Sequence, residues 1–350
     1  MFANGRNGTI MKTGPYFMIK KILFLLVGLC FSISCAHAQE MPPHDSSKAA
    51  ENIESKDKKK IVVGIFITNI SKIDLGKKSV NVGFCLWWRS PYSDCDYARN
   101  MEIVDACDVK INRMRSPYKI KNDHAGIGHF SCDVLSSWEV TNFPFDRQQI
   151  VLSIESTQDE FEDLQFVPDT KNSGVYSDLI LHGWTIVSTK LIEGPYLYKT
   201  GFDNPDKHES VFSRISMVIE LKRLGGRIFF NYFVGFFLAA FLCGMTFCVE
   251  TSNLMARLNL NVASIFVAVG NKYILDQSLP LTSVFSLADA IQLSTFFLIT
   301  LTVSTNVACN FLHKTDHSQR ALFFNKYLGI TMILCYVSYL SYMVLSAIYS

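Results

Sequence analysis

Charged side chains nearly disappear from the C-terminal part of this 350-residue chain. The segment 225–312 holds six Asp, Glu, Lys or Arg residues, and 327–350 holds none. Four apolar runs follow one another there, at about 228–249, 256–276, 285–312 and 323–348. Each is long enough to cross a bilayer as a helix, which needs about 20 apolar residues. The pattern predicts a multi-pass transmembrane domain over 225–350 and excludes a purely cytosolic enzyme.

The N-terminus has the features of a secretory signal. Two lysines precede the apolar run 22–34, which is too short to span a bilayer. The tripeptide Ala-His-Ala at 36–38 is a small-x-small site of the kind that signal peptidase cleaves. We therefore predict a signal peptide over 1–38, followed by a flexible, polar leader over 39–60.

The segment 61–224 changes to a period of two. Short runs rich in β-branched and aromatic residues are separated by Asn, Asp, Gly and Pro. They lie at 61–67, 80–88, 149–154, 184–187 and 214–221. Because no convincing helix separates them, the pattern predicts an all-β, immunoglobulin-like sandwich that ends at Gly225-Gly226.

Four cysteines lie outside both the signal and the apolar spans: Cys85, Cys95, Cys107 and Cys132. An exported domain would meet an oxidising environment, so a bridge between Cys95 and Cys107 is one candidate among three pairings. No Cys-x-x-Cys spacing occurs, and we predict neither a metal nor a cofactor. The net charge of +2 gives no reason to expect a nucleic-acid partner.

The second apolar span differs from the others. Its small, polar and aromatic residues recur at steps of four and three and so share one helix face. They are Asn259, Ala263, Phe266, Gly270 and Tyr273. The face could be buried among protein neighbours, or it could line a water-filled pore, because polar groups at membrane depth face protein or water.

The segment 142–149, Asn-Phe-Pro-Phe-Asp-Arg-Gln-Gln, resembles the Phe-Pro-Phe-Asp-x-Gln loop of pentameric ligand-gated ion channels, the Cys-loop receptor superfamily. The order of parts over 61–350 is similar as well. Ser136 and Ile150 stand where animal receptors have the loop cysteines, and the last two spans have a short connection, as in bacterial members. The resemblance implies a homopentamer in the cell membrane, with the N-terminal domain and the C-terminus outside.

The resemblance also implies which residues couple the two domains. The loop supplies Phe143, Pro144, Phe145 and Asp146, Arg223 precedes the first span, and Pro280 follows the second. In the family the loop aspartate lies near the arginine at the junction between the domains. The alternative is that Asp146 only caps its own turn.

An agonist would bind between adjacent subunits, under a hairpin that corresponds to 194–210 here. The residues assigned to this site are Glu155, Tyr196, Tyr198, Phe202, Phe212 and Trp88, with Trp87 as the alternative to the last. Aromatic rings attract cations, and we predict as agonist a small amine or another cation held by Glu155. Thr157 stands where amine-gated members have a ring, each aromatic could instead belong to the sandwich core, and gating by protons remains open.

The resemblance places the stripe of the second span at the pore, between Arg257 at the inner mouth and Asp276 at the outer end. Ala256-Arg257 is typical of anion-selective members. A ring of Asp276 carboxylates and the selectivity usual among bacterial members instead favour cations. We predict that cations permeate. Phe266 is the predicted apolar gate, and Val267 is the alternative.

The sequence therefore predicts a ligand-gated ion channel rather than an enzyme. No Ser-His-Asp elbow, metal cluster or phosphate loop supports catalysis. A membrane-anchored periplasmic hydrolase and a non-conducting periplasmic sensor or adhesion protein are the alternatives from other classes.

Overall fold

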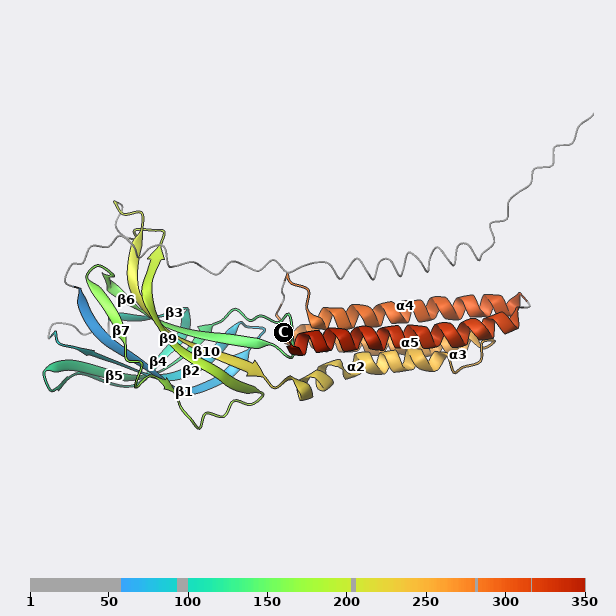
Figure 1. The fold of residues 1–350 in the computed structure, drawn as a ribbon, viewed down its shortest axis with the longest axis horizontal. Coiled ribbons are helices and arrows are strands. Elements are labelled where there is room, and N and C mark those ends of the chain that lie inside the picture. The colour runs from blue at the N-terminus through green and yellow to red at the C-terminus, as the bar shows by residue number, and fades with distance from the viewer. Residues whose placement is uncertain (1–57, 93–99, 203–205, 281–282, 316, 350) are drawn as a thin grey trace, which may run out of the picture. The chain divides into compact units, whose positions relative to one another are not determined.

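The computed structural model describes residues 58–92, 100–202, 206–280, 283–315 and 317–349. Within these ranges ten strands come first and four long helices follow (Figure 1). The strands form two sheets that pack around a shared apolar core, which makes this a β-sandwich. The predicted signal peptide and nearly all of the predicted leader lie outside the described residues.

The first sheet has the strand order β4-β5-β2-β1-β7, with β8 beside β1, and the second has the order β3-β6-β10-β9. The strands of the first sheet are β1 (Lys59–Asp74), β2 (Ser79–Ser90), β4 (Ala106–Ile120), β5 (Asp123–Leu135), β7 (Leu164–Pro168) and β8 (Gly174–Val175). Those of the second are β3 (Met101–Val104), β6 (Arg147–Glu160), β9 (Trp184–Tyr198) and β10 (Ser210–Arg223).

Alternating burial explains why these segments form strands. Ile61, Val63 and Ile65 of β1 turn inward, and Ile215 and Met217 of β10 face them from the other sheet. The five runs recognised in the sequence all lie inside observed strands. The long strand β4 gave no such signal, because its side chains are almost all exposed on both faces. Its backbone pairing with β5 holds it in the sheet.

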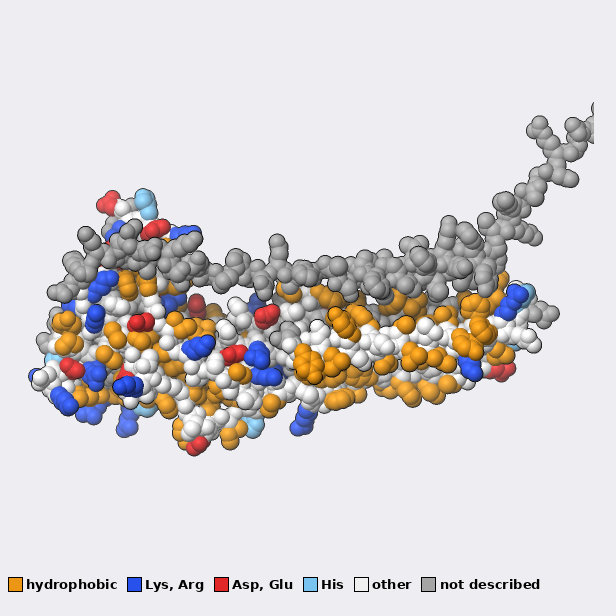
Figure 2. All heavy atoms as spheres, viewed as in Figure 1, with side chains coloured by type: hydrophobic (Ala, Val, Ile, Leu, Met, Phe, Trp, Pro, Cys, Tyr) orange, Lys and Arg blue, Asp and Glu red, His pale blue; other side chains and the backbone are white. Residues whose placement is uncertain are grey.

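The helices are α2 (Gly225–Thr246), α3 (Leu254–Ser278), α4 (Leu287–Lys314) and α5 (Ser318–Tyr349). All four are long and apolar enough to cross a membrane. The fourth begins five residues before the apolar run at 323, since a helix can start in a polar turn that hydropathy does not detect. On the face drawn in Figure 2, hydrophobic side chains cover much of the helices, while charged ones gather over the strands and the helix ends.

Candidate functional site

Asp146 and Arg223 form a buried ion pair where the sandwich meets the helices. The Arg223 Nε donates to Asp146 Oδ1 at 2.7 Å, and Nη2 donates to Oδ2 at 3.0 Å. The side chains are 2% and 8% exposed, respectively. Gln148 donates a further hydrogen bond to Asp146 Oδ2. This geometry is bidentate, the strongest form of an arginine–carboxylate contact. Asp146 therefore does more than cap its own turn.

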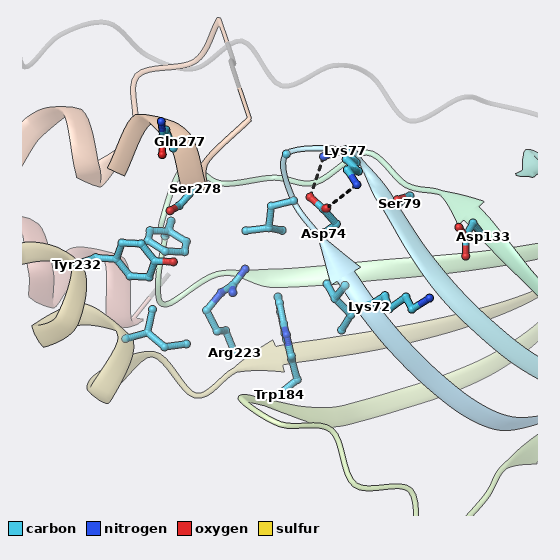
Figure 3. Close-up of a pocket in the computed structure, with 15 residues that line it drawn as sticks. Lys72, Asp74, Lys77, Ser79, Asp133, Trp184, Arg223, Tyr232, Gln277 and Ser278 are labelled. Atoms are coloured by element: carbon cyan, nitrogen blue, oxygen red, sulfur yellow. Dashed lines mark hydrogen bonds and ion pairs between the residues drawn. The ribbon is translucent and has the colours of Figure 1, made fainter. Parts of the chain in front are cut away.

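Arg223 also lies against aromatic rings and beside a cavity. Its guanidinium carbon is 3.9 Å from the centroid of the Trp184 ring and 5.1 Å from that of Phe143. Figure 3 shows Arg223 between Trp184 and Tyr232, pointing into a cavity of about 770 Å³. The turn after β1, the end of β10, the start of α2 and the end of α3 all line this cavity. Elements of both domains therefore meet around one arginine.

The Phe-Pro-Phe-Asp loop itself contacts two helices. The Phe143 ring meets Tyr232 of α2 with centroids 5.5 Å apart, and Phe145 meets Phe229 at 5.6 Å. A Cβ on Gly225 would overlap the carbonyl of Pro144, so the loop and the start of α2 approach as closely as glycine allows. The loop also reaches α4, because the Leu287 N–H donates to the Thr141 carbonyl at 2.7 Å. Pro280, just beyond α3, is buried.

The predicted stripe of α3 lies on one exposed face of the subunit. Asn259, Ala263, Phe266, Gly270 and Tyr273 all belong to it, with Phe266 74% exposed and Tyr273 66% exposed. Val267 is half-buried and packs against the core of the subunit. The register therefore turns Phe266 outward in place of Val267. Asp276 is exposed too, but Lys272, one turn earlier, binds its carboxylate at 2.6 Å.

Arg257 does not lie on this face, so its prediction as a pore residue is wrong for the subunit as folded. It is fully buried, and Nε and Nη2 donate to the carbonyl of Val249, which follows α2. Nε also reaches the Glu250 carbonyl, and Nη1 donates to Asn306 of α4 at 3.1 Å. The sequence led us to assign Arg257 to the inner mouth of the pore because this residue lies in the first turn of α3. A long side chain with five donors instead turns inward to carbonyls that lack helical partners.

The opposite face of α3 is polar as well. Asn271 is buried against α2, where its Oδ1 accepts from the Gly235 N–H at 3.2 Å and its Nδ2 donates to the Tyr232 carbonyl at 2.8 Å. A Cβ on Gly235 would overlap the Asn271 side chain. Gly235 is therefore a close-contact position between two helices, and its glycine follows from that contact.

The predicted ligand site is a cluster of aromatic rings on β9 and β10. Tyr198 contacts Tyr196 with centroids 4.9 Å apart and Phe202 at 5.2 Å, while Phe212 lies 6.0 Å from both Tyr198 and Phe202. The structure therefore brings four of the predicted aromatic residues together. It also adds a residue to which the sequence assigned no role, Arg214, two positions beyond Phe212 on the same face of β10.

Arg214 occupies the place that an amine was expected to take. Its guanidinium carbon lies 3.4 Å from the Tyr196 centroid, and both Nε and Nη2 lie 2.7 Å from Glu155 Oε2. Nη2 donates to the Tyr198 hydroxyl as well. Burial, and then the charge of Glu155, raise the pKa of Tyr198 to about 12. Glu155 is buried, and its Oε2 is already paired with this arginine of the chain itself.

Trp88 is buried in the core, so the surface of the described subunit does not offer it to a ligand between subunits. It is 3% exposed and belongs to the core between the sheets, on β2 of the other sheet. Trp87, which points the other way, donates to Asp169 at 3.2 Å. Cys85, Cys107 and Cys132 hold free thiols, and Cys95 lies outside the described residues.

No protein-family model matches the sequence, and a search of curated proteins finds no significant relative. The functional argument therefore rests on the geometry of the chain. Besides Arg214, sequence reasoning missed Asn271 and Trp184. The alternation of β10 placed Arg214 on the Phe212 face, but no pattern in the sequence indicated the other two.

Proposed function

We propose that the chain is one subunit of a ligand-gated ion channel, in which the exposed face of α3 lines the pore and the sandwich controls it. The face of α3 carries this proposal. Among the four candidate spans α3 has the lowest mean hydropathy, 1.2 against 1.5 to 2.0. The same helix exposes Asn259, Gly270 and Asp276 on its surface. Polar groups at membrane depth need water or protein around them.

A ring of copies satisfies this requirement. One helix per subunit cannot enclose a channel, so several α3 helices must turn the same face to a common axis. A homopentamer is the proposed assembly, in keeping with the resemblance of the Phe-Pro-Phe-Asp loop. The sandwich and the C-terminus would lie outside the cell membrane, and ligands would bind between neighbouring sandwiches.

The distribution of charge favours cations as the permeating ions. Arg257 is withdrawn from the exposed face of α3, which removes the positive ring expected at the inner end. Glu250, in the turn before α3, is exposed there. At the outer end Asp276 shares its charge with Lys272, so any ring of carboxylates would be weakened.

The buried pair of Asp146 and Arg223 supports the coupling of ligand to gate. The pair joins the loop at 142–146 to the strand that continues into α2. Because rings of that loop pack on α2 and the adjacent Thr141 accepts a hydrogen bond from α4, a displacement of the sandwich would reach the helices through direct contacts rather than through a flexible linker.

Currents across a planar bilayer containing the purified full chain test the proposal. Since the ligand is unidentified, the Phe266→Ser variant serves as the probe, because it replaces the exposed apolar collar with a hydroxyl. We expect discrete, ligand-independent currents from Phe266→Ser. The matched control is Phe241→Ser, which changes another exposed phenylalanine, 61% against 74% exposed, on α2 instead of the proposed pore helix. Silence from both variants would favour a non-conducting sensor or adhesion protein.

A further inference from the structure

Arg214 supplies a cation from the chain itself inside the aromatic cluster. We propose that the ligand of this site is therefore a small carboxylate with an apolar group, bound to the outer edge of Arg214, and not an amine. The inference rests on the proposed function, whose ligand class it names.

The carboxylate of Glu155 is already paired with Arg214. Glu155, 7% exposed, receives two contacts of 2.7 Å from Arg214, and the guanidinium covers the Tyr196 ring at 3.4 Å. An amine would need both the carboxylate and a ring face. Arg214 already takes Glu155 Oε2 and the Tyr196 ring, and displacing it would leave a poorly solvated guanidinium without its partner.

The Nη1 group of Arg214 is an unused hydrogen-bond donor. A guanidinium carries five N–H groups, and those on Nε and Nη2 account for the contacts with Glu155 and Tyr198. Nη1 donates no hydrogen bond to any of the residues that the structure describes. The Arg214 side chain is 15% exposed, so part of it reaches the surface. Arginine edges of this kind bind carboxylates through paired, charge-assisted hydrogen bonds.

An open position lies beside the arginine. In the pairing of β9 with β10, Gly194 stands directly opposite Arg214, and opposed residues project from the same face of a sheet. A Cβ built on Gly194 would meet no atom within 4 Å. Phe202, 61% exposed, offers an apolar surface in the same cluster. A carboxylate over Gly194 with an apolar group toward Phe202 fits both features.

Two probes of similar size and opposite charge test the ligand class: phenylacetate and phenethylamine. Binding to the purified full chain is followed by calorimetry and by the shift of the melting temperature. We expect phenylacetate to bind and to raise the melting temperature, and phenethylamine to do neither. Binding of phenethylamine as tight as that of phenylacetate, or no binding of either probe, would overturn the proposal.

Substitutions locate the site. Arg214→Ala should abolish phenylacetate binding and free Glu155 and Tyr196 to bind phenethylamine, which reverses the preference. If that variant does not fold, Gly194→Val decides, because it fills the open position without touching the ion pair. It should weaken phenylacetate binding about tenfold, the loss expected for one charged hydrogen bond. The control Arg147→Ala, an exposed arginine of the same sheet, should bind as the wild type does.

The outcomes separate this inference from the proposed function. If Phe266→Ser conducts but the wild type prefers phenethylamine, only the ligand class is wrong. If Phe266→Ser conducts and Gly194→Val binds phenylacetate unchanged, only the position of the site is wrong. If phenylacetate binds as expected and Phe266→Ser is silent, the site stands and the channel does not.

Discussion

At the scale of single residues, the buried pair Asp146–Arg223 and the exposed pair Arg147–Glu220 offer a direct comparison. The first is at most 8% exposed, whereas Arg147 is 55% exposed. Asp146→Ala or Arg223→Ala should each lower the free energy of unfolding by about 3–5 kcal/mol, since each strands a buried charge. Arg147→Ala should cost no more than about 1 kcal/mol. Denaturation of the purified variants measures both.

Removing both members of the buried pair should cost less than the sum of the single losses, because no unpaired charge then remains. The same variants test coupling. Suppose that one of the single variants folds and its channel opens with normal ligand sensitivity. The pair is then structural and does not couple ligand binding to opening of the pore.

Arg257 leads to a second prediction at this scale. Its buried guanidinium holds the carbonyls of Val249 and Glu250 and the amide of Asn306. Arg257→Ala should lower the free energy of unfolding by about 3 kcal/mol or more, because the Val249 carbonyl and the buried Asn306 amide both lose their donor. The reversal potential in a salt gradient should not change, since the charge does not face the proposed pore. A shift in the reversal potential would contradict this prediction and indicate that Arg257 faces the pore.

At the scale of elements, α3 presents one face outward and packs the other. Phe266 is 74% exposed, while Val267 packs against the subunit core. Five phenyl rings on one axis would form a collar without hydrogen-bond partners for water. Phe266→Ser should therefore shift the ligand response to lower concentration, and Val267→Ala should leave it unchanged. Equal responses from the two variants would mean that the outward face has been misassigned.

The contact between α2 and α3 supports another prediction. Gly235→Ala would push a methyl group into Asn271, and overpacking of this kind costs about 1–3 kcal/mol. Gly226→Ala is the control in the same helix, because a Cβ there meets nothing within 4 Å. Thermal denaturation in detergent should separate the two. Equal stability would show that the helices move apart at little cost.

At the scale of the whole molecule, the proposed channel requires neighbouring copies around the exposed aromatic and polar face of α3. We expect native mass spectrometry of the full chain to show five subunits. In the assembled ring Asp276→Asn should move the reversal potential toward that of anions, but only modestly, since Lys272 already binds the carboxylate. A wild-type channel that prefers anions would contradict the proposed selectivity.

Some properties of the chain follow from its sequence alone. Apolar runs of sufficient length predicted four candidate membrane helices, and alternation predicted a β-rich domain before them, because both patterns report how one segment meets its solvent. The exposed stripe of α3 was predictable for the same reason. The strand β4 was not, because its side chains are exposed on both faces and only its neighbour holds it.

The tertiary structure decided the rest, and it did so through side chains that reach across elements. Arg257 was assigned to a mouth by its position in the chain, but its long side chain turns inward to the carbonyls after α2. Glu155 was assigned to an external amine, but the register of β6 against β10 places Arg214 directly opposite it. A sequence states which charges are present. Which of them neutralise one another depends on pairing between distant segments, and only the folded chain determines that pairing.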